Sequence, residues 1–313
     1  YHSAKFSARV TDKACLIMTG ADSGKVCPVQ APALAERPVR PLRCCGARGD
    51  SMSYNERSDG YQGVKYGAVA MILIGGAFVL KMCGGLAGIF GGLPPMTPLA
   101  AQSQLLNDPQ SGPLFKTLQK TYPSEFDGLT NELARRGAEF QSKQDIVSGG
   151  RAYLLAAMKR HLGEIGEAPH ASLSDYRKSE IAALQALQID DAASCAAYFT
   201  TGVINLPKAT SAVKTAMTEF QIKTWTTAAA GRDQSVKRTV AKPGVEDVKA
   251  IMSRAAQVGS NQDDVDKLLA GTSLPDKAEC GAGLALLQGI DALPDARADN
   301  FTAFMVQTVA AKS

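Results

Sequence analysis

One long apolar stretch, residues 64–93, constrains this chain more than any other feature. Tyr66 to Leu80 is fifteen residues without a charge, and twelve more uncharged residues follow Lys81. A helix that crosses the hydrocarbon core of a bilayer needs about 20 apolar residues. We therefore expect residues 64–93 to form a transmembrane helix that anchors the chain in a lipid bilayer. The alternatives are a buried glycine-rich hairpin and a cleaved signal peptide, although a signal core is shorter, at about 7–15 residues.

Two features of this stretch bear on how it sits in the bilayer. Lys81 lies in the last turns of such a span, where its side chain can reach the lipid headgroups. Gly84, Gly88 and Gly92 recur at a four-residue spacing that lets two membrane helices approach closely. A homo-oligomer is therefore one reading. We prefer the alternative that these glycines form a flexible segment where the chain leaves the membrane, because two prolines follow directly.

Charge is distributed unevenly on the two sides of this stretch. Residues 1–81 carry eleven Lys/Arg and six Asp/Glu, whereas residues 82–313 carry twenty-three and twenty-four. The positive-inside rule then places the N-terminus in the cytoplasm and the C-terminal part outside it, as in a bacterial inner-membrane protein. The C-terminal part has no basic stripe interleaved with aromatic residues, so we expect no nucleic-acid partner.

The chain divides into four segments. Residues 1–63 lack a periodic apolar face. We interpret residues 1–51 as a non-native or disordered extension, with Met52 as a candidate natural start. After the apolar stretch 64–93, residues 94–112 are rich in Pro, Gly and Ser and predict a linker. Residues 113–313 predict an all-α domain of about seven or eight helices, bundle-like, because apolar residues recur at helical spacing and no alternating strand pattern appears.

Specific boundaries follow from helix-capping and helix-breaking residues. Ser172 is a candidate N-cap for a helix that continues to Gly202. Within the helical segment 138–162, the pair Gly149 and Gly150 predicts a break. No internal repeat of fixed period is present, so a solenoid is not expected.

The sequence offers no recognisable catalytic motif. The run from Gly20 to Lys25 has one residue too few between its glycines for a phosphate loop, and Val26 stands where that loop needs Ser or Thr. The N-terminal cysteines lack the paired Cys-x-x-Cys spacing of a zinc site, and no Gly-x-Ser-x-Gly nucleophile elbow occurs. We therefore expect no cofactor and no metal.

Only two histidines, His161 and His170, occur in the C-terminal region. His161 stands near Glu164 and Glu167 on neighbouring turns of one predicted helix, a combination that suits acid–base chemistry or a metal. Neither histidine has the context of the Glu-x-x-His or His-Glu-x-x-His metal motifs, so we expect both to be ordinary surface residues. Trp225 is expected in the core.

The two cysteines beyond the apolar stretch, Cys195 and Cys280, lie on the apolar sides of their predicted helices. If those helices run antiparallel, the two thiols can lie level and form a disulfide, which an oxidising compartment would favour. The alternative is a pair of independent buried thiols, since free cysteine is among the most buried residue types.

These observations favour a membrane-anchored extracytoplasmic helical protein that acts as an interaction or scaffold module with a protein partner, rather than an enzyme. The alternative is an extracytoplasmic enzyme, such as a hydrolase, whose site assembles in three dimensions around His161 or His170 and nearby carboxylates. A concave pocket that combines either histidine with carboxylates would favour the enzyme. A smooth bundle with an exposed apolar groove would favour the interaction module.

Overall fold

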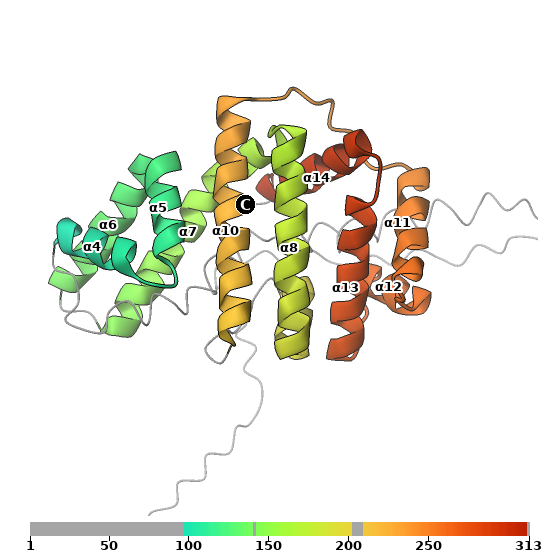
Figure 1. The fold of residues 1–313 in the computed structure, drawn as a ribbon, viewed down its shortest axis with the longest axis horizontal. Helices are drawn as coiled ribbons and strands as arrows, with labels where there is room; N and C mark the ends of the chain where they lie inside the picture. The colour runs from blue at the N-terminus through green and yellow to red at the C-terminus, as the bar shows by residue number, and fades with distance from the viewer. Residues whose placement is uncertain (1–96, 140–141, 202–208, 312–313) are drawn as a thin grey trace, which may run out of the picture. The chain divides into compact units, whose positions relative to one another are not determined.

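The computed structural model describes residues 97–139, 142–201 and 209–311. In these ranges the secondary structure is entirely helical, with eleven helices and no strand (Figure 1). The all-α class is therefore confirmed, and the helices outnumber the seven or eight that the sequence predicts. They are α4 Pro98–Asn107, α5 Gly112–Thr121, α6 Pro123–Ala138, α7 Lys143–Gly166, α8 His170–Asp190, α9 Ala192–Thr201, α10 Ser211–Asp233, α11 Val245–Gln257, α12 Gln262–Leu269, α13 Asp276–Asp291 and α14 Asp295–Ala310.

Capping side chains fix several of the helix starts. The Thr210 hydroxyl accepts a hydrogen bond from the backbone N–H of Val213 at 3.4 Å and opens α10. The Ser142 hydroxyl does the same for Asp145 at 3.2 Å and opens α7. Each bond satisfies one of the backbone donors that the first turn of a helix leaves without a partner.

The glycine pair does not break a helix, contrary to the sequence prediction. Helix α7 runs through Gly149 and Gly150, and both residues are buried. A Cβ atom at Gly149 would collide with the guanidinium of Arg136, and one at Gly150 would lie 2.8 Å from a methyl carbon of Leu133. Both neighbours belong to α6. The glycines therefore allow two helices to approach closely, which explains their presence inside a helix.

The helix predicted from Ser172 to Gly202 is two helices within the described range. α8 begins two residues before Ser172, at His170, and the chain leaves helical geometry at Asp191, with φ −153° and ψ 92°. The Asp191 carboxylate then accepts hydrogen bonds from the backbone N–H groups of Ala193 and Ser194, at 3.1 and 3.2 Å. A short acidic side chain that can cap a new helix thus ends one helix and begins the next.

Three predicted segments fall wholly or partly outside the described residues. The predicted extension 1–63 and the predicted membrane span 64–93 lie outside them. Of the predicted linker 94–112, residues 98–107 form α4, whose apolar side chains Ala101 and Leu105 are fully buried. Within the described ranges, no helix is both long enough and apolar enough to cross a bilayer.

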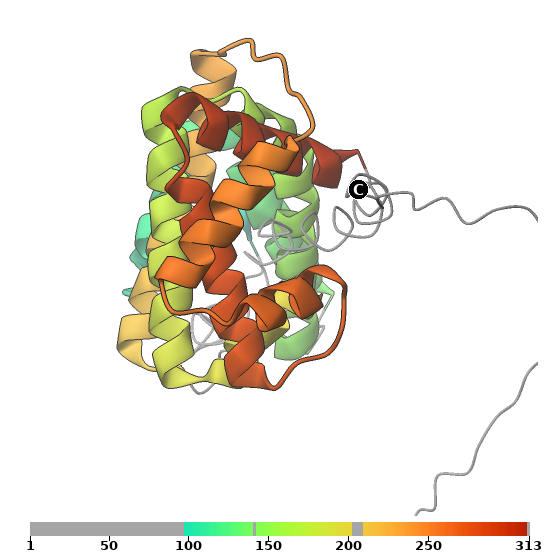
Figure 2. The same cartoon turned by 90° about the vertical axis from the view of Figure 1, so that its right-hand side faces the viewer.

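The described helices enclose two apolar cores. One is formed by α4 to α7, the C-terminal half of α10 and the end of α14, and it includes the fully buried Trp225, as expected. The other is formed by α8, α9, the N-terminal half of α10 and α11 to α14. Helices α10, α8 and α13 stand side by side, and α14 crosses the end of this row (Figures 1 and 2).

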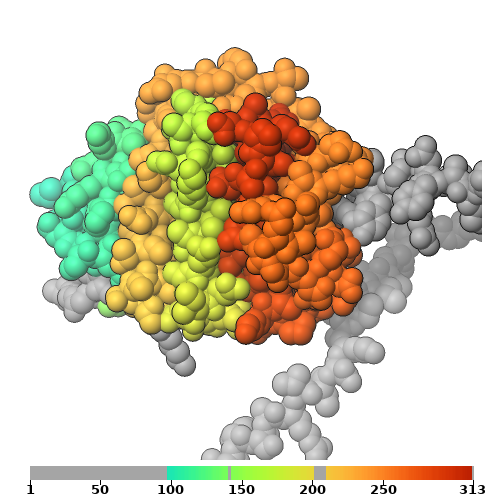
Figure 3. Space-filling model, turned by 45° about the vertical axis from the view of Figure 1, so that its right-hand side comes forward, coloured from blue at the N-terminus to red at the C-terminus, as the bar shows by residue number. Residues whose placement is uncertain are grey.

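Helix α8 contributes side chains to both cores and reaches the surface in a strip between α10 and the C-terminal helices (Figure 3). Its other sides face α10, α13, α9 and α14. Two polar residues that matter for a candidate functional site lie on α8. His170 is its first residue, and Glu180 lies at its middle.

Candidate functional site

The two histidines of the described residues occupy two separate polar clusters. His161 lies on α7 with its ring against Tyr122, at 4.2 Å between ring centroids. Its Nε2 is 3.0 Å from a carboxylate oxygen of Glu125, and its Nδ1 is 3.1 Å from one of Glu164. The His161 side chain is only 17% exposed, so the expectation of an ordinary surface residue is wrong for this histidine.

Further side chains occupy the carboxylates of the His161 cluster. Arg160 donates two hydrogen bonds to Glu125, at 3.1 and 2.5 Å, and the Tyr153 hydroxyl donates a third at 3.2 Å. Tyr122 donates its hydroxyl hydrogen to Glu164. Burial opposes ionisation of Glu125, but the hydrogen bonds from Arg160 and His161 outweigh it, so the pKa of this carboxyl is lowered. Every group of this cluster is thus engaged by another member.

The second histidine, His170, faces a surface hollow of about 680 Å³. Its Nδ1 lies 3.1 Å from both carboxylate oxygens of Asp299, and its Nε2 lies 3.3 Å from a carboxylate oxygen of Asp295. The Asp299 side chain is 5% exposed, whereas Asp295 is 83% exposed. The hollow is lined by the N-terminal turns of α8 and α14 and by the connection 234–244: His170, Arg238, Thr239, Asp295, Ala296, Asp299 and Asn300.

Two arginines from different parts of the fold donate hydrogen bonds to the carboxylate of Asp299. Arg177, on α8, donates to Asp299 at 3.0 Å, to the Thr302 hydroxyl at 3.2 Å and to Asp291 at 3.1 Å. Arg238, on the connection 234–244, donates to Asp299 at 3.4 Å. The positively charged donors offset the cost of burying the Asp299 carboxylate and hold it in place. The carboxylate can therefore fix the orientation of the His170 imidazole.

A buried glutamate lies further along α8. Glu180 is 1% exposed and accepts a hydrogen bond from the Tyr198 hydroxyl. Burial raises its pKa to about 7, and the Tyr198 hydrogen bond opposes this rise only in part. Burial also raises the pKa of Tyr176 and of Tyr198 well above their ordinary range, with the nearby Glu180 charge as a further cause.

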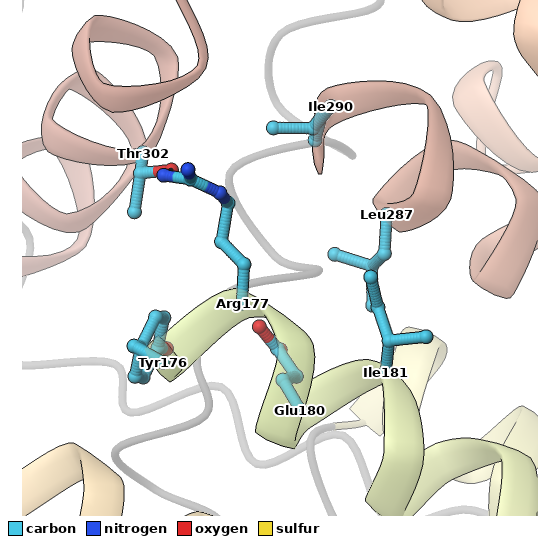
Figure 4. Close-up of a pocket in the computed structure, with 7 residues that line it drawn as sticks. All are labelled: Tyr176, Arg177, Glu180, Ile181, Leu287, Ile290 and Thr302. Atoms are coloured by element: carbon cyan, nitrogen blue, oxygen red, sulfur yellow. Dashed lines mark hydrogen bonds between the residues drawn. The ribbon is translucent and has the colours of Figure 1, made fainter. Parts of the chain in front are cut away.

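A small cavity adjoins the Glu180 carboxyl group (Figure 4). Its volume is about 10 Å³, the size that a single water molecule needs. Glu180 and Arg177 enter it from α8, and Thr302 comes from α14 (Figure 4). The remaining lining is mostly apolar: Tyr176, Ile181, Leu287 and Ile290.

The structure brings together only part of what the sequence predicted around the histidines. Glu164 does contact His161, but Glu167 instead pairs with Ser235 and Lys237 at the end of α7. Glu125 was missed, although one signal existed: it lies four residues before Leu129 and eight before Leu133, on the same apolar face of its helix. No local signal could have found Asp299, because it lies 129 residues from His170. Among the described residues, no group of three or more His, Cys, Asp or Glu is arranged to hold a metal.

The disulfide prediction is confirmed. Cys195 and Cys280 are joined, with 5.3 Å between their Cα atoms, and both side chains are fully buried. The bond links α9 to α13 inside the second core. The described part of the chain is thus a disulfide-linked all-α domain. No protein-family model matches the chain, and its comparison with characterised proteins and with solved structures gave no significant match.

Proposed function

We propose that this chain is a membrane-anchored extracytoplasmic protein whose helical domain acts as an interaction or scaffold module. The observation that carries the proposal is the disulfide between Cys195 and Cys280. Disulfides form and persist in oxidising compartments and are rare in the cytosol. The apolar stretch 64–93 would supply the anchor, and the excess of basic residues before it supports a cytoplasmic N-terminus.

The His161 cluster supports a binding module rather than an enzyme. Both ring nitrogens of His161 are engaged by carboxylates, and Glu125 is further held by Arg160. A catalytic base needs a nitrogen that can reach a substrate proton. Hydrogen bonds among these side chains hold α6 against α7. In this proposal a partner therefore binds the outer surface of the domain and not this cluster.

Topology is the first test of this proposal. A reporter that is active only outside the cytoplasm, fused after Ser313, should be active on the full chain and silent when residues 64–93 are deleted. The exported chain should also be lighter by its two thiol hydrogens before reduction than after it, because the disulfide is formed. Activity with and without residues 64–93, or a fully reduced exported chain, would contradict the proposal.

The second test asks for the partner directly. A photo-crosslinking side chain placed at Ile189, which is 89% exposed, should give a discrete crosslinked species in intact cells. The mass of that species distinguishes a second copy of this chain from a different protein. The same side chain at the exposed Val245 reports whether the contact is confined to one face. Absence of any discrete species from several exposed positions would count against an interaction module.

The hollow at His170 favours a second candidate, an extracytoplasmic hydrolase. It is a concave pocket that combines a histidine with Asp295 and Asp299, and the buried Asp299 orients the imidazole as the aspartate of a catalytic triad does. Unlike the carboxylates around His161, Asp295 at the Nε2 atom of His170 is 83% exposed, so it can turn aside for a substrate. The test is ester and phosphoester hydrolysis by the full chain in detergent. His170→Gln should abolish the activity, and the matched variant His161→Gln should retain it. No hydrolysis by the unaltered chain, or equal loss in both variants, would exclude this candidate.

A further inference from the structure

The connection 234–244 is an exposed segment that carries several basic residues. It joins α10 to α11 as an arch without regular secondary structure, and most of its residues are exposed (Figure 1). Of the Lys and Arg residues in the described ranges, only Lys237, Arg238 and Lys242 lie outside a helix. A helix must open before a protease can bind its backbone, so exposed loops are the preferred sites of proteolytic cleavage.

The backbone of this connection is held at two places. The backbone N–H of Val236 donates to the carbonyl oxygen of Glu167 at 2.8 Å. The side-chain amide of Asn300 bonds both backbone groups of Ala241, at 3.2 and 3.0 Å. Between these places, no backbone group of residues 237–240 forms a hydrogen bond with any residue that the structure describes. A protease can therefore bind this stretch without first breaking backbone hydrogen bonds within it.

The two basic residues in this stretch differ in how accessible their side chains are. The Lys237 side chain is 82% exposed, and its contact is an ion pair with Glu167 at 3.1 Å. An exposed ion pair of this kind contributes little energy and exchanges readily. The Arg238 side chain is 14% exposed and donates to the buried Asp299 at 3.4 Å. Lys237 is therefore the side chain that a protease can take up without disturbing the hollow.

The disulfide spans this connection. Cys195 on α9 precedes it and Cys280 on α13 follows it, so one cut in the connection leaves the two parts covalently joined. The two parts also share their packing, since α13 lies against α8 and α9, and α14 lies against α7. After such a cut the hollow would be formed by two chains. His170 would come from the first chain, and Asp295 and Asp299 from the second.

We propose that the peptide bond between Lys237 and Arg238 is a cleavage site for a serine protease of trypsin-like specificity, and that the cut gives a two-chain domain that stays folded. A trypsin-like protease takes the basic side chain before the cut bond into an acidic pocket. The step is a hydrolysis that consumes one water, so Lys237 then ends in a carboxylate and Arg238 begins with an ammonium group. The site depends neither on the membrane anchor nor on any activity of the hollow.

Limited digestion of the full chain in detergent with trypsin tests this site. A fragment that begins at Arg238 should form at least about 10-fold faster than any fragment cut at a helical Lys or Arg. On a denaturing gel without reductant, this fragment should stay attached to the part that contains Cys195, and a thiol should release it. Circular dichroism and Trp225 fluorescence should be unchanged by the cut, because both chains remain packed.

Two variants within the connection make the test specific. Lys237→Gln changes an exposed side chain, and it should slow cleavage of the connection about 10-fold or more, because Arg238 must first leave Asp299. Lys242→Gln is the matched control. The bond after Lys242 precedes Pro243, which has no N–H to offer a protease, so this variant should be cut as fast as the unaltered chain.

Four results would overturn the proposal. The first is cleavage of Lys237→Gln at the rate of the unaltered chain. The second is a set of cuts within the described helices that precede the cut after Lys237. The third is release of the fragment that begins at Arg238 without reductant, and the fourth is loss of the circular dichroism signal as that fragment forms.

Discussion

The disulfide between Cys195 and Cys280 gives the most quantitative prediction. The perturbation is the double variant Cys195→Ala with Cys280→Ala. The two cysteines are 85 residues apart, and both are fully buried. In the entropic description, a crosslink that closes a loop of this length restricts the unfolded chain by about 4–5 kcal/mol. The double variant should therefore lose about 4–5 kcal/mol of its free energy of unfolding.

Urea unfolding followed by two probes measures this loss. Trp225 is the one tryptophan of the chain and is fully buried in the first core, whereas the disulfide lies in the second. Tryptophan fluorescence and far-ultraviolet circular dichroism should give the same midpoint if both cores unfold together. The slope of the free energy against urea should be steeper for the double variant, because its unfolded state is less compact.

Reductant supplies the internal control. Unfolding the unaltered chain in the presence of a thiol reductant should shift its midpoint to that of the double variant, whose own midpoint should not respond. Without urea the bond should resist reduction, because neither sulfur is accessible to the reagent. A double variant within about 1 kcal/mol of the oxidised chain would refute the loop-closure reasoning.

Two further predictions concern packing and charge. Gly231→Ala should strongly destabilise the fold, because the added Cβ would overlap the backbone carbonyl oxygen of Glu164. The added Cβ of Gly163→Ala meets nothing within 4 Å, so this variant should stabilise α7 by about 0.5–1 kcal/mol. Equal thermal midpoints for the two variants would contradict this prediction. Burial raises the pKa of Glu125, but hydrogen bonds, first that of Arg160, outweigh burial and lower the pKa overall. The ionised carboxylate therefore stabilises the fold at pH values above the ordinary glutamate pKa of 4.5, and this stabilisation is lost as the pH falls. Glu125→Gln should therefore cost about 1–3 kcal/mol at neutral pH and flatten the acid-unfolding profile, and an unchanged acid midpoint would contradict the argument.

The boundaries of the helices show where local sequence is informative and where it is not. The turn between α11 and α12 carries local signals: Gly259 follows α11 with a φ of +86°, a conformation that favours glycine, and the Asn261 side chain accepts a hydrogen bond from the backbone N–H of Asp263 and opens α12. The glycine pair at 149–150 misled the prediction, because its role is to admit Arg136 and Leu133 from a neighbouring helix. A glycine that breaks a helix and one that lets another helix approach look the same in sequence.

The candidate site separates local from distant information in the same way. The contact between His161 and Glu164 could be predicted, since residues three apart on a helix are neighbours. Glu125 and Asp299 could not be assigned to their histidines, because the contacts span 36 and 129 residues. Those contacts depend on how one helix packs against another, and the sequence of a single helix does not indicate which helix it packs against.

By itself, the sequence determined the all-α class, the burial of Trp225 and the possibility of a bond between Cys195 and Cys280. These properties follow from helical periodicity and from the apolar face on which each residue lies, and both are local. Only the tertiary structure decided that the two thiols lie level, that Asp299 sits beneath His170 and that Glu180 is sealed beside a water-sized cavity. The physical reason is that hydrogen bonds within a helix join residues four apart, whereas these arrangements depend on packing between helices distant in the chain.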